Sequence, residues 1–255
     1  MLFFRWLRQL VHDVRRGFPA LLQRYTRYFR WGFRIGFTLF CIEIGYIWGL
    51  TPDWDQFIHG PIQKSRMMMD YEFERAQHPG WPALRWFPVS MDNIPKQLAR
   101  AVIVAEDSRF YQHKGFDQQA ISKAMEYNLS KGSFAYGAST ISQQTIKNFL
   151  LNPSKNPLRK LHEAILTYSM EKNVGKRRIL EMYLNIAEFG RGIYGVNAAA
   201  KYYFGKSVDH ITMDEAIELA ATLPSPVKNN PKTRSEQFLR HRDKIRSHLG
   251  FPELR

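Results

Sequence analysis

The sequence is poor in cysteine, because Cys41 is the only one among its 255 residues. A single cysteine excludes an internal disulfide framework and a metal site built from several cysteines. Patterns typical of β-strands are sparse, and the chain contains no internal repeats and no low-complexity tract. The 44% apolar and 14% aromatic content excludes a disordered or fibrous chain. We therefore expect one mainly α-helical domain of roughly 200 residues, preceded by an extension.

Acidic residues are almost absent from the first 34 positions, where eight arginines face Asp13 alone. This segment carries +7, which is half of the formal net charge of +14. Aromatic residues such as Trp6 and Trp31 are interleaved with the arginines, a pattern compatible with nucleic-acid stacking and with a bilayer surface. The apolar run that follows favours the bilayer.

That apolar run, Ile35–Pro52, contains only one charged residue, Glu43. As a helix it would be roughly 27 Å long, close to the hydrocarbon thickness of a bilayer. A buried helix of a soluble domain is the alternative, but the arginine flank and the aromatic edge of Tyr46 and Trp48 favour a membrane anchor. A small-residue cleavage site does not follow the run, so we expect an uncleaved anchor whose arginine-rich side stays in the cytoplasm.

The remaining chain changes character near residue 94. Residues 53–93 show no sustained apolar period and are predicted to form an ordered but irregular connector near the membrane surface. Apolar spacing then predicts helices over residues 95–107, 140–151, 158–172, 178–185, 197–203 and 214–223. The predicted organisation is a cytoplasmic segment 1–34, an anchor 35–52, a connector 53–93 and a domain 94–255.

The first chemically rich segment follows the helix predicted over residues 95–107, where Glu106 and Asp107 precede Phe110, His113 and Gly115. A carboxylate at the end of an apolar helix is partly desolvated, and desolvation raises its pKa toward the range that suits proton transfer. A helix terminus followed by a polar turn is the simpler interpretation. His113 taken alone is more typical of a hydrogen-bonded structural residue than of a general base.

The second segment begins at Thr140, which is predicted to cap a helix together with Gln143 at capping-box spacing. On that helix Gln143 and Lys147 are four residues apart, as are Gln144 and Asn148, so amides and an ammonium group share one face. Such a face beside a helix N-terminus suits phosphate oxygens. A well-capped polar surface helix would give the same pattern.

The third segment contains Arg159, Lys160 and Glu163, whose spacing lets all three side chains share one helical face. A surface ion-pair patch is the ordinary interpretation, and such a patch contributes little stability. The more specific hypothesis is a diphosphate site, in which the cations offset the charge of a leaving group and Glu163 positions a lysine.

Taken in order, these segments resemble the peptidoglycan glycosyltransferase family (family 51) in its monofunctional, membrane-anchored form. The resemblance covers about residues 95–231. The family's first motif is met at Glu106, Asp107, Phe110, His113 and Gly115, the second at Gly137, Ser139, Thr140, Gln143, Gln144, Lys147 and Asn148, the third at Arg159, Lys160 and Glu163, and the fourth at Lys176, Ile179, Leu180, Tyr183 and Asn185. Ala138 and Ser142 replace a frequent glycine and threonine.

The resemblance implies a mainly α, lysozyme-like glycosyltransferase domain preceded by one N-terminal transmembrane helix. It implies polymerisation of lipid II into β-1,4-linked glycan strands with release of undecaprenyl diphosphate, and it assigns catalysis to Glu106, the general base, and Glu163. Substrate and diphosphate binding is implied for Lys147, Arg159, Lys160, Gln143, Gln144, Asn148, Ser139 and Thr140. Supporting roles are implied for Asp107, Phe110, His113, Gly115, Tyr183 and Asn185.

The same resemblance implies a single-pass protein of the bacterial cytoplasmic (inner) membrane, with a cytoplasmic N-terminus and a periplasmic catalytic domain. Expected partners are lipid II, the growing glycan chain, transpeptidases and the division machinery, and no nucleic acid. Mg²⁺ or Mn²⁺ is compatible with the diphosphate site, although the metal ligands are undefined, and no organic cofactor is expected. Ser225 and Lys228 match a penicillin-reactive Ser-x-x-Lys pattern, but Pro231 opposes the helix that this pattern needs, so no transpeptidase activity is expected.

Two other classes of protein compete with this interpretation. A lytic transglycosylase or lysozyme-type hydrolase would use a similar helical fold and one or two carboxylates, but it would need no cations for a diphosphate. A basic membrane scaffold or nucleic-acid binder would leave the three segments as solvated faces without chemistry. The set formed by Lys147, Arg159 and Lys160 argues against the hydrolase.

Overall fold

The computed structural model describes residues 2–132, 137–152 and 158–251, with side chains described from residue 26 onward. The chain divides into two compact units, Met1–Thr51 and Pro52–Arg255. The side chains of Arg5, Arg8, Arg15, Arg16 and Arg24, on which the cytoplasmic segment was predicted, lie outside the described residues.

The first unit is one helix, α1 (Leu2–Leu50). Its large apolar side chains are exposed over the predicted anchor, including Phe37 and Trp48. Within the described residues, one helical stretch, Thr26–His59, is long and apolar enough to cross a membrane by length and composition. The helix runs without a break through Arg34 and Ile35, so the predicted border there is a change in composition and not in secondary structure.

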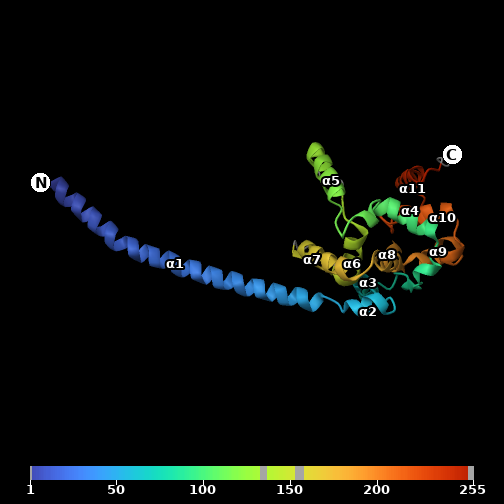
Figure 1. Ribbon diagram of the computed structural model, residues 1–255, viewed down its shortest axis with the longest axis horizontal. Coiled ribbons are helices and arrows are strands. Elements are labelled where there is room, and N and C mark those ends of the chain that lie inside the picture. Colours follow the sequence, from blue (N-terminus) through green and yellow to red (C-terminus); the bar gives the residue numbers. More distant parts are fainter. Residues whose placement is uncertain (1, 133–136, 153–157, 252–255) are drawn as a thin grey trace. The chain divides into compact units, whose positions relative to one another are not determined.

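The second unit is built mainly from short helices (Figure 1). Its elements are α2 (Trp54–His59), α3 (Arg66–Gln77), β1 (Arg85–Trp86), α4 (Lys96–Glu106), α5 (Gln118–Lys131), α6 (Ile141–Leu150), α7 (Leu158–Asn173), α8 (Lys176–Ile186), β2 (Glu188–Gly190), β3 (Ile193–Tyr194), α9 (Val196–Phe204), α10 (Met213–Thr222) and α11 (Glu236–His248), with 3-10 turns at Met91–Asn93, Phe110–Gln112 and Val208–His210.

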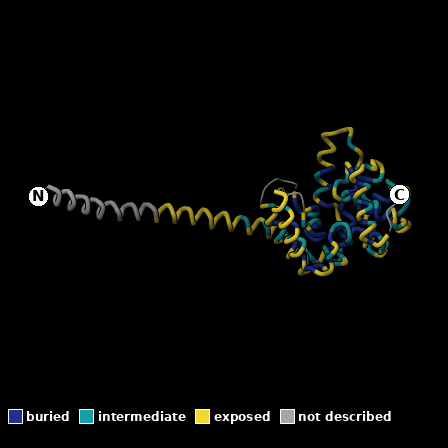
Figure 2. Tube along the Cα trace, turned by 90° about the horizontal axis from the view of Figure 1, so that it is seen from above, coloured by how far each residue is buried: buried dark blue, intermediate teal, exposed yellow. Residues whose placement is uncertain are grey.

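The core of this unit forms where α6 packs against α7 and α8, and where α4 packs against α10 and α11. Figure 2 shows the buried positions gathered inside the unit, while much of its rim is exposed. Fully buried side chains include Leu98 on α4, Ile146 on α6 and Tyr183 on α8. Burying each large apolar side chain contributes about 1.5–3 kcal/mol, so these contacts fix α4, α6 and α8 relative to one another.

The small sheet has the strand order β1-β3-β2, with β1 parallel and β2 antiparallel to β3. Its tight turn requires glycine at residue 192, where φ is +73° and an added Cβ would lie 2.6 Å from Oη of Tyr71. Asn185 connects α8 to the strand region, because its Nδ2 donates to the carbonyl of Val89 and its Oδ1 accepts from the Val89 N–H. These bonds agree with the supporting role that was implied for Asn185.

The predicted helices are confirmed within a few residues at α4, α6, α7, α8, α9 and α10. The prediction of an irregular connector over residues 53–93 is wrong, because α2 and α3 form there and Met68 and Tyr71 of α3 are buried. A side-chain cap starts each of these helices: Asp53 accepts from the N–H of Asp55, and Ser65 accepts from the N–H of Met68. Short helices stabilised by caps and tertiary contacts show little apolar period in the sequence.

Helices α5 and α11 were not predicted. Asp117 caps α5 through the N–H groups of Gln119 and Ala120, yet Ala124 is the only buried residue of this helix. Helix α5 extends away from the neighbouring helices, as Figure 1 shows. In α11 the buried residues are Phe238, Arg242 and Ile245, and an arginine among so few apolar residues hides the helical pattern.

Candidate active site

Glu106 is the last residue of α4, and two side chains from other helices hold its carboxylate in place. Nε2 of Gln144 on α6 donates to Oε2 of Glu106 at 2.7 Å. Oη of Tyr183 on α8 in turn donates to Oε1 of Gln144 at 3.3 Å. Burial raises the pKa of Glu106, and Asp107 raises it further, while the Gln144 hydrogen bond and the nearby Lys147 lower it. The carboxylate is therefore oriented and more basic than an exposed glutamate, which suits a general base.

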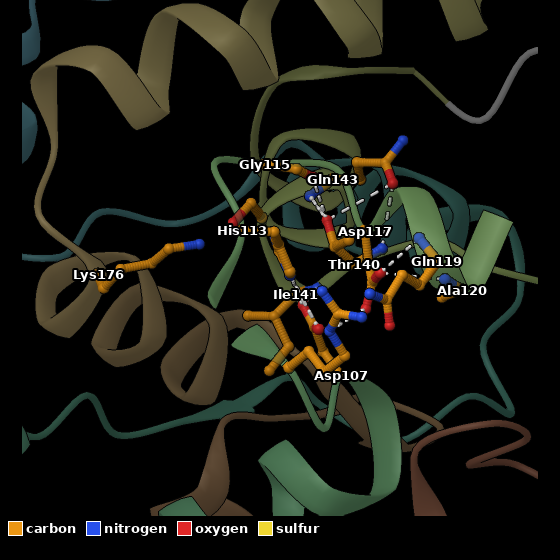
Figure 3. A network of polar contacts seen from close by, with 12 residues as sticks. Asp107, His113, Gly115, Asp117, Gln119, Ala120, Thr140, Ile141, Gln143 and Lys176 are labelled. Atoms are coloured by element: carbon orange, nitrogen blue, oxygen red, sulfur yellow. Dashed lines mark hydrogen bonds and ion pairs between the residues drawn. The ribbon is translucent and has the colours of Figure 1, made fainter. Parts of the chain in front are cut away.

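Asp107, His113 and the start of α6 form a buried positioning network, drawn in Figure 3. Nε2 of His113 lies 2.9 and 3.0 Å from the two carboxylate oxygens of Asp107. The N–H of Ile141 donates to Oδ2 of the same carboxylate, and Oγ1 of Thr140 donates to the carbonyl of Gly115 at 2.6 Å. The first and second sequence motifs are thus tied together at the N-terminus of α6.

The backbone of Gly115 lies close to side chains of α7 in this network. Its φ is +90°, and an added Cβ would lie 3.0 Å from Cγ2 of Thr167 and 3.2 Å from Cγ of Glu171. A side chain would be strained here both by the backbone conformation and by α7. Phe110 is fully buried nearby, and Nζ of Lys176 lies 4.3 Å from the centre of its ring. Phe110 and Gly115 are therefore both packed inside the fold beside the positioning network.

The two adjacent glutamines of α6 each hold one of the two predicted catalytic glutamates. Gln144 binds Glu106, as described, and Nε2 of Gln143 donates to Oε1 of Glu163 at 3.3 Å. Oε1 of Gln143 also accepts from the N–H of Thr140, which completes the predicted capping box. Both amides were predicted to bind substrate, whereas the structure shows them engaged with protein carboxylates.

Lys147, Arg159 and Lys160 form a cation cluster around Glu163. The Glu163 side chain is only 2% exposed, it contacts Nζ of Lys160, and its Oε2 lies 3.6 Å from Nη1 of Arg159. Desolvation lowers the pKa of Lys147. The positive charges of Arg159 and Lys160 lower this pKa further, whereas the negative charges of Glu163 and Glu106 raise it. Three cations share one fully buried carboxylate, so the cluster carries a positive surplus that suits an anionic group.

Two cavities adjoin these groups. The base-side cavity, of about 380 Å³, is lined by Glu106, Asp107, Ser139 and Thr140 together with His241 and Lys244 of α11. The cation-side cavity, of about 430 Å³, is lined by Lys147, Asn148 and Arg159 together with Asp70, Glu188 and Arg191.

The sequence patterns did not indicate the residues that α3, α11 and the β2–β3 turn contribute to these cavities. The glycines near residue 190 indicated only a turn, and α11 carried no recognised pattern. Of the predicted set, Glu106, Asp107, Ser139 and Thr140 meet at the base-side cavity, and Lys147, Asn148 and Arg159 meet at the cation-side cavity.

Among the described residues, no group of three or more His, Cys, Asp or Glu side chains is arranged to hold a metal ion. The nearest carboxylate to the cation cluster, Glu163, is already engaged by Lys160, Arg159 and Gln143. A divalent cation at this place would therefore depend on oxygen ligands from a bound phosphate and from water.

Comparison with known proteins adds independent findings. The profile of the family described as Transglycosylase matches residues 82–249. A biosynthetic peptidoglycan transglycosylase of Nitrosospira multiformis is 49% identical over 142 residues, which cover 56% of this chain and 61% of that protein. A protein of the same name from Shewanella frigidimarina is 44% identical over 182 residues, which cover 71% of this chain and 76% of that protein. Another, from Azoarcus sp., is 39% identical over 196 residues, which cover 77% of this chain and 84% of that protein.

Proposed function

This chain belongs to the transglycosylase family, and from that premise we propose that it polymerises lipid II into the β-1,4-linked glycan strands of peptidoglycan. The lysozyme-like helical fold of the family agrees with the helical domain described above. The observation that carries the proposal is an oriented carboxylate with a raised pKa, Glu106, within electrostatic reach of Lys147 in a cation cluster.

In the proposed reaction Glu106 is the general base. It takes the proton of the 4-hydroxyl group of the acceptor's N-acetylglucosamine, and the oxygen attacks the anomeric carbon of the growing chain's terminal muramyl unit. The bond between that carbon and the diphosphate oxygen breaks, undecaprenyl diphosphate leaves, and the configuration inverts. Gln144 supports this role because its amide keeps one carboxylate oxygen in place and leaves the other for the hydroxyl proton.

The leaving diphosphate gains negative charge as the glycosidic bond breaks, and the cation cluster is suited to offset that charge. Lys147 and Arg159 line the cation-side cavity, and the Lys160 side chain is 56% exposed and thus accessible. Glu163 positions Lys160 and partly balances the cluster before substrate binds. Its role in this scheme is to hold the cations, and it transfers no proton.

A divalent cation remains part of the proposal only as a companion of the substrate. Because the described residues provide no cluster of three suitable ligands, Mg²⁺ or Mn²⁺ would be bound chiefly by diphosphate oxygens. Each step above is carried by Glu106 and the cation cluster. We accordingly expect a chelator to change turnover less than substitution of Lys147 does.

The proposed location is the cytoplasmic membrane, with α1 as a single-pass anchor. The arginines of residues 5–34 favour a cytoplasmic N-terminus, which sends the second unit to the periplasmic side, where lipid II is polymerised. Transpeptidases and division proteins are the proposed protein partners.

The decisive experiment incubates the full-length chain in detergent with labelled lipid II and separates the products by length. We expect glycan polymers from the wild type and none from Glu106→Gln, while Glu126→Gln, at an exposed position of α5, polymerises normally. Circular dichroism should show that both variants are folded. Shortening of added sacculi without polymer formation would favour the hydrolase instead, and full activity of Glu106→Gln would contradict the assigned base.

A further inference from the structure

The cation-side cavity extends beyond the groups that the proposed reaction uses. One part of its lining comes from Lys147, Asn148 and Arg159. Asn148 is only 8% exposed, and its Oδ1 has no hydrogen-bond partner among the described residues. A buried amide oxygen without a partner is costly, so this acceptor in the cavity wall is suited to a hydrogen-bond donor on a ligand.

A different part of the lining is acidic. It contains Asp70 and Glu74 of α3 and Glu188 of β2. Oδ1 of Asp70 accepts from Nε of Arg66 at 2.8 Å, but its Oδ2 is buried and has no partner among the described residues. All three carboxylates act on the phenol of Tyr194, whose pKa is raised by burial first and then by Glu188, Glu74 and Asp70. The three acids and Tyr194 also line the same cavity.

Within the described part of the chain, Arg66 pairs with Asp70, and Arg191 is the cation that acts on Glu188. The guanidinium of Arg191 lies 4.4 Å from the centre of the Trp81 ring, and its charge lowers the pKa of Glu188. Burial has the larger effect and raises the pKa of Glu188 to about 7. A carboxylate in this condition would be stabilised by a further positive charge.

The cavity thus offers the cations Lys147 and Arg159 at one part of its wall and carboxylates at another, which suits a ligand that carries both an anionic and a cationic group. Lipid II has this character, because its peptide includes a diamino acid whose second amino group is an ammonium at neutral pH. We propose that the carboxylates of Asp70, Glu74 and Glu188 bind this peptide ammonium. The inference rests on the proposed function and adds a recognition site for the peptide.

The test compares two labelled substrates on the full-length chain: lipid II with the free side-chain amine, and the same molecule with that amine acetylated. Acetylation removes the charge with little change elsewhere. For the wild type we expect KM to be about tenfold higher for the acetylated substrate, with kcat within about twofold. Glu188→Gln and Glu74→Gln should reduce this discrimination to about twofold or less. Glu236→Gln, an exposed position of α11, should retain the full discrimination.

Equal KM values for the two substrates with the wild type would overturn the ammonium site while leaving the proposed function intact. Retained discrimination in both Glu188→Gln and Glu74→Gln would also overturn it. Because Glu74 is exposed on α3, its variant remains informative if Glu188→Gln folds poorly. If the wild type polymerises neither substrate, the proposed function fails first, and the inference fails with it.

Discussion

The positioning network and the cation cluster use charged residues in opposite ways. In the network, Asp107 is buried, and both of its oxygens accept hydrogen bonds from His113 or from the backbone of α6. In the cluster, Lys147, Arg159 and Lys160 lie around the buried carboxylate of Glu163, and the Lys160 side chain is 56% exposed. In the first arrangement the protein engages both oxygens of the Asp107 carboxylate, although Nδ1 of His113 has no partner among the described residues. The second arrangement is suited to an anionic ligand.

On the proposed function, this difference separates the residues that build the site from those that would act on substrate. A buried, satisfied charge stabilises the fold, and its removal leaves its partners without hydrogen bonds. An exposed, uncompensated charge contributes little to folding and can bind a substrate strongly. Substitutions in the two regions should therefore produce opposite combinations of effects on stability and turnover.

The largest effect is expected from Asp107→Ala. The substitution leaves the N–H of Ile141 and the ring of His113 without their buried acceptor, so the free energy of unfolding should fall by about 3 kcal/mol and kcat/KM by at least about 100-fold. Chemical denaturation of the full-length chain and the lipid II assay measure the two quantities. Asp92→Ala, at an exposed ion pair with Arg177, serves as control and should change neither.

Lys147→Ala should lower turnover strongly while leaving stability nearly unchanged. We expect kcat/KM to fall about 100-fold, because one cation that offsets the leaving diphosphate is lost, while the free energy of unfolding changes by less than about 1 kcal/mol. Lys160→Ala should behave in the same way with a smaller loss. Lys172→Ala, an exposed cation farther along α7, should retain activity. A loss of stability in Lys147→Ala as large as in Asp107→Ala would remove the distinction between the two regions.

Gln144→Ala tests a residue that joins the two regions through Glu106. The Gln144 hydrogen bond lowers the pKa of Glu106, so its removal raises that pKa further and the base ionises only at higher pH. The acidic limb of the kcat/KM profile should then move to higher pH, with activity at pH 7 reduced about tenfold. Gln143→Ala, which releases Glu163 instead, should lower activity without moving that limb. An unmoved profile in Gln144→Ala would contradict the assignment of Glu106 as base.

The sequence alone predicted much of the local structure. Thr140 and Gln143 were predicted to form a capping box, and both of its hydrogen bonds are present. The pairing of Gln144 with Glu106, and of Gln143 with Glu163, could not be predicted from spacing. It depends on how α6 packs against α4 and α7, and apolar periods reveal that a helix is buried but not its rotation against a neighbour.

The sequence could not predict that Asp70, Glu74 and Glu188 line one cavity, for a related reason. Asp70 lies on α3 and Glu188 on β2, more than 100 positions apart, and neither belongs to a pattern that suggests a site. The packing of Tyr71 of α3 near Tyr194 of β3, with ring centres 5.9 Å apart, helps to bring these elements together. Long-range contacts of this kind follow from the whole fold and leave no local signal.

Substitution of Glu188 should act in the direction opposite to that of Asp107, because it should stabilise the chain relative to the wild type as pH rises. The pKa of Glu188 is about 7 in the folded chain and 4.5 as its ordinary value, so the folded state holds a proton that the unfolded state releases between these values. The stability that comes from this group is present below pH 4.5 and is lost as pH rises through about 7. Glu188→Gln keeps a neutral side chain at every pH.

Between pH 5 and pH 8, the unfolding free energy of Glu188→Gln should therefore rise relative to the wild type by about 2 kcal/mol. Arg191, Tyr194 and Tyr203 surround the carboxylate, and the two tyrosines stay neutral over this range because burial raises their pKa values. Denaturation of both proteins at the two pH values measures the difference, and Glu236→Gln should show none. If the difference in unfolding free energy between the two proteins stayed constant across this range, ionising Glu188 would carry no cost in the folded chain. Glu188 would then resemble Asp107, an acid whose charge the protein itself compensates.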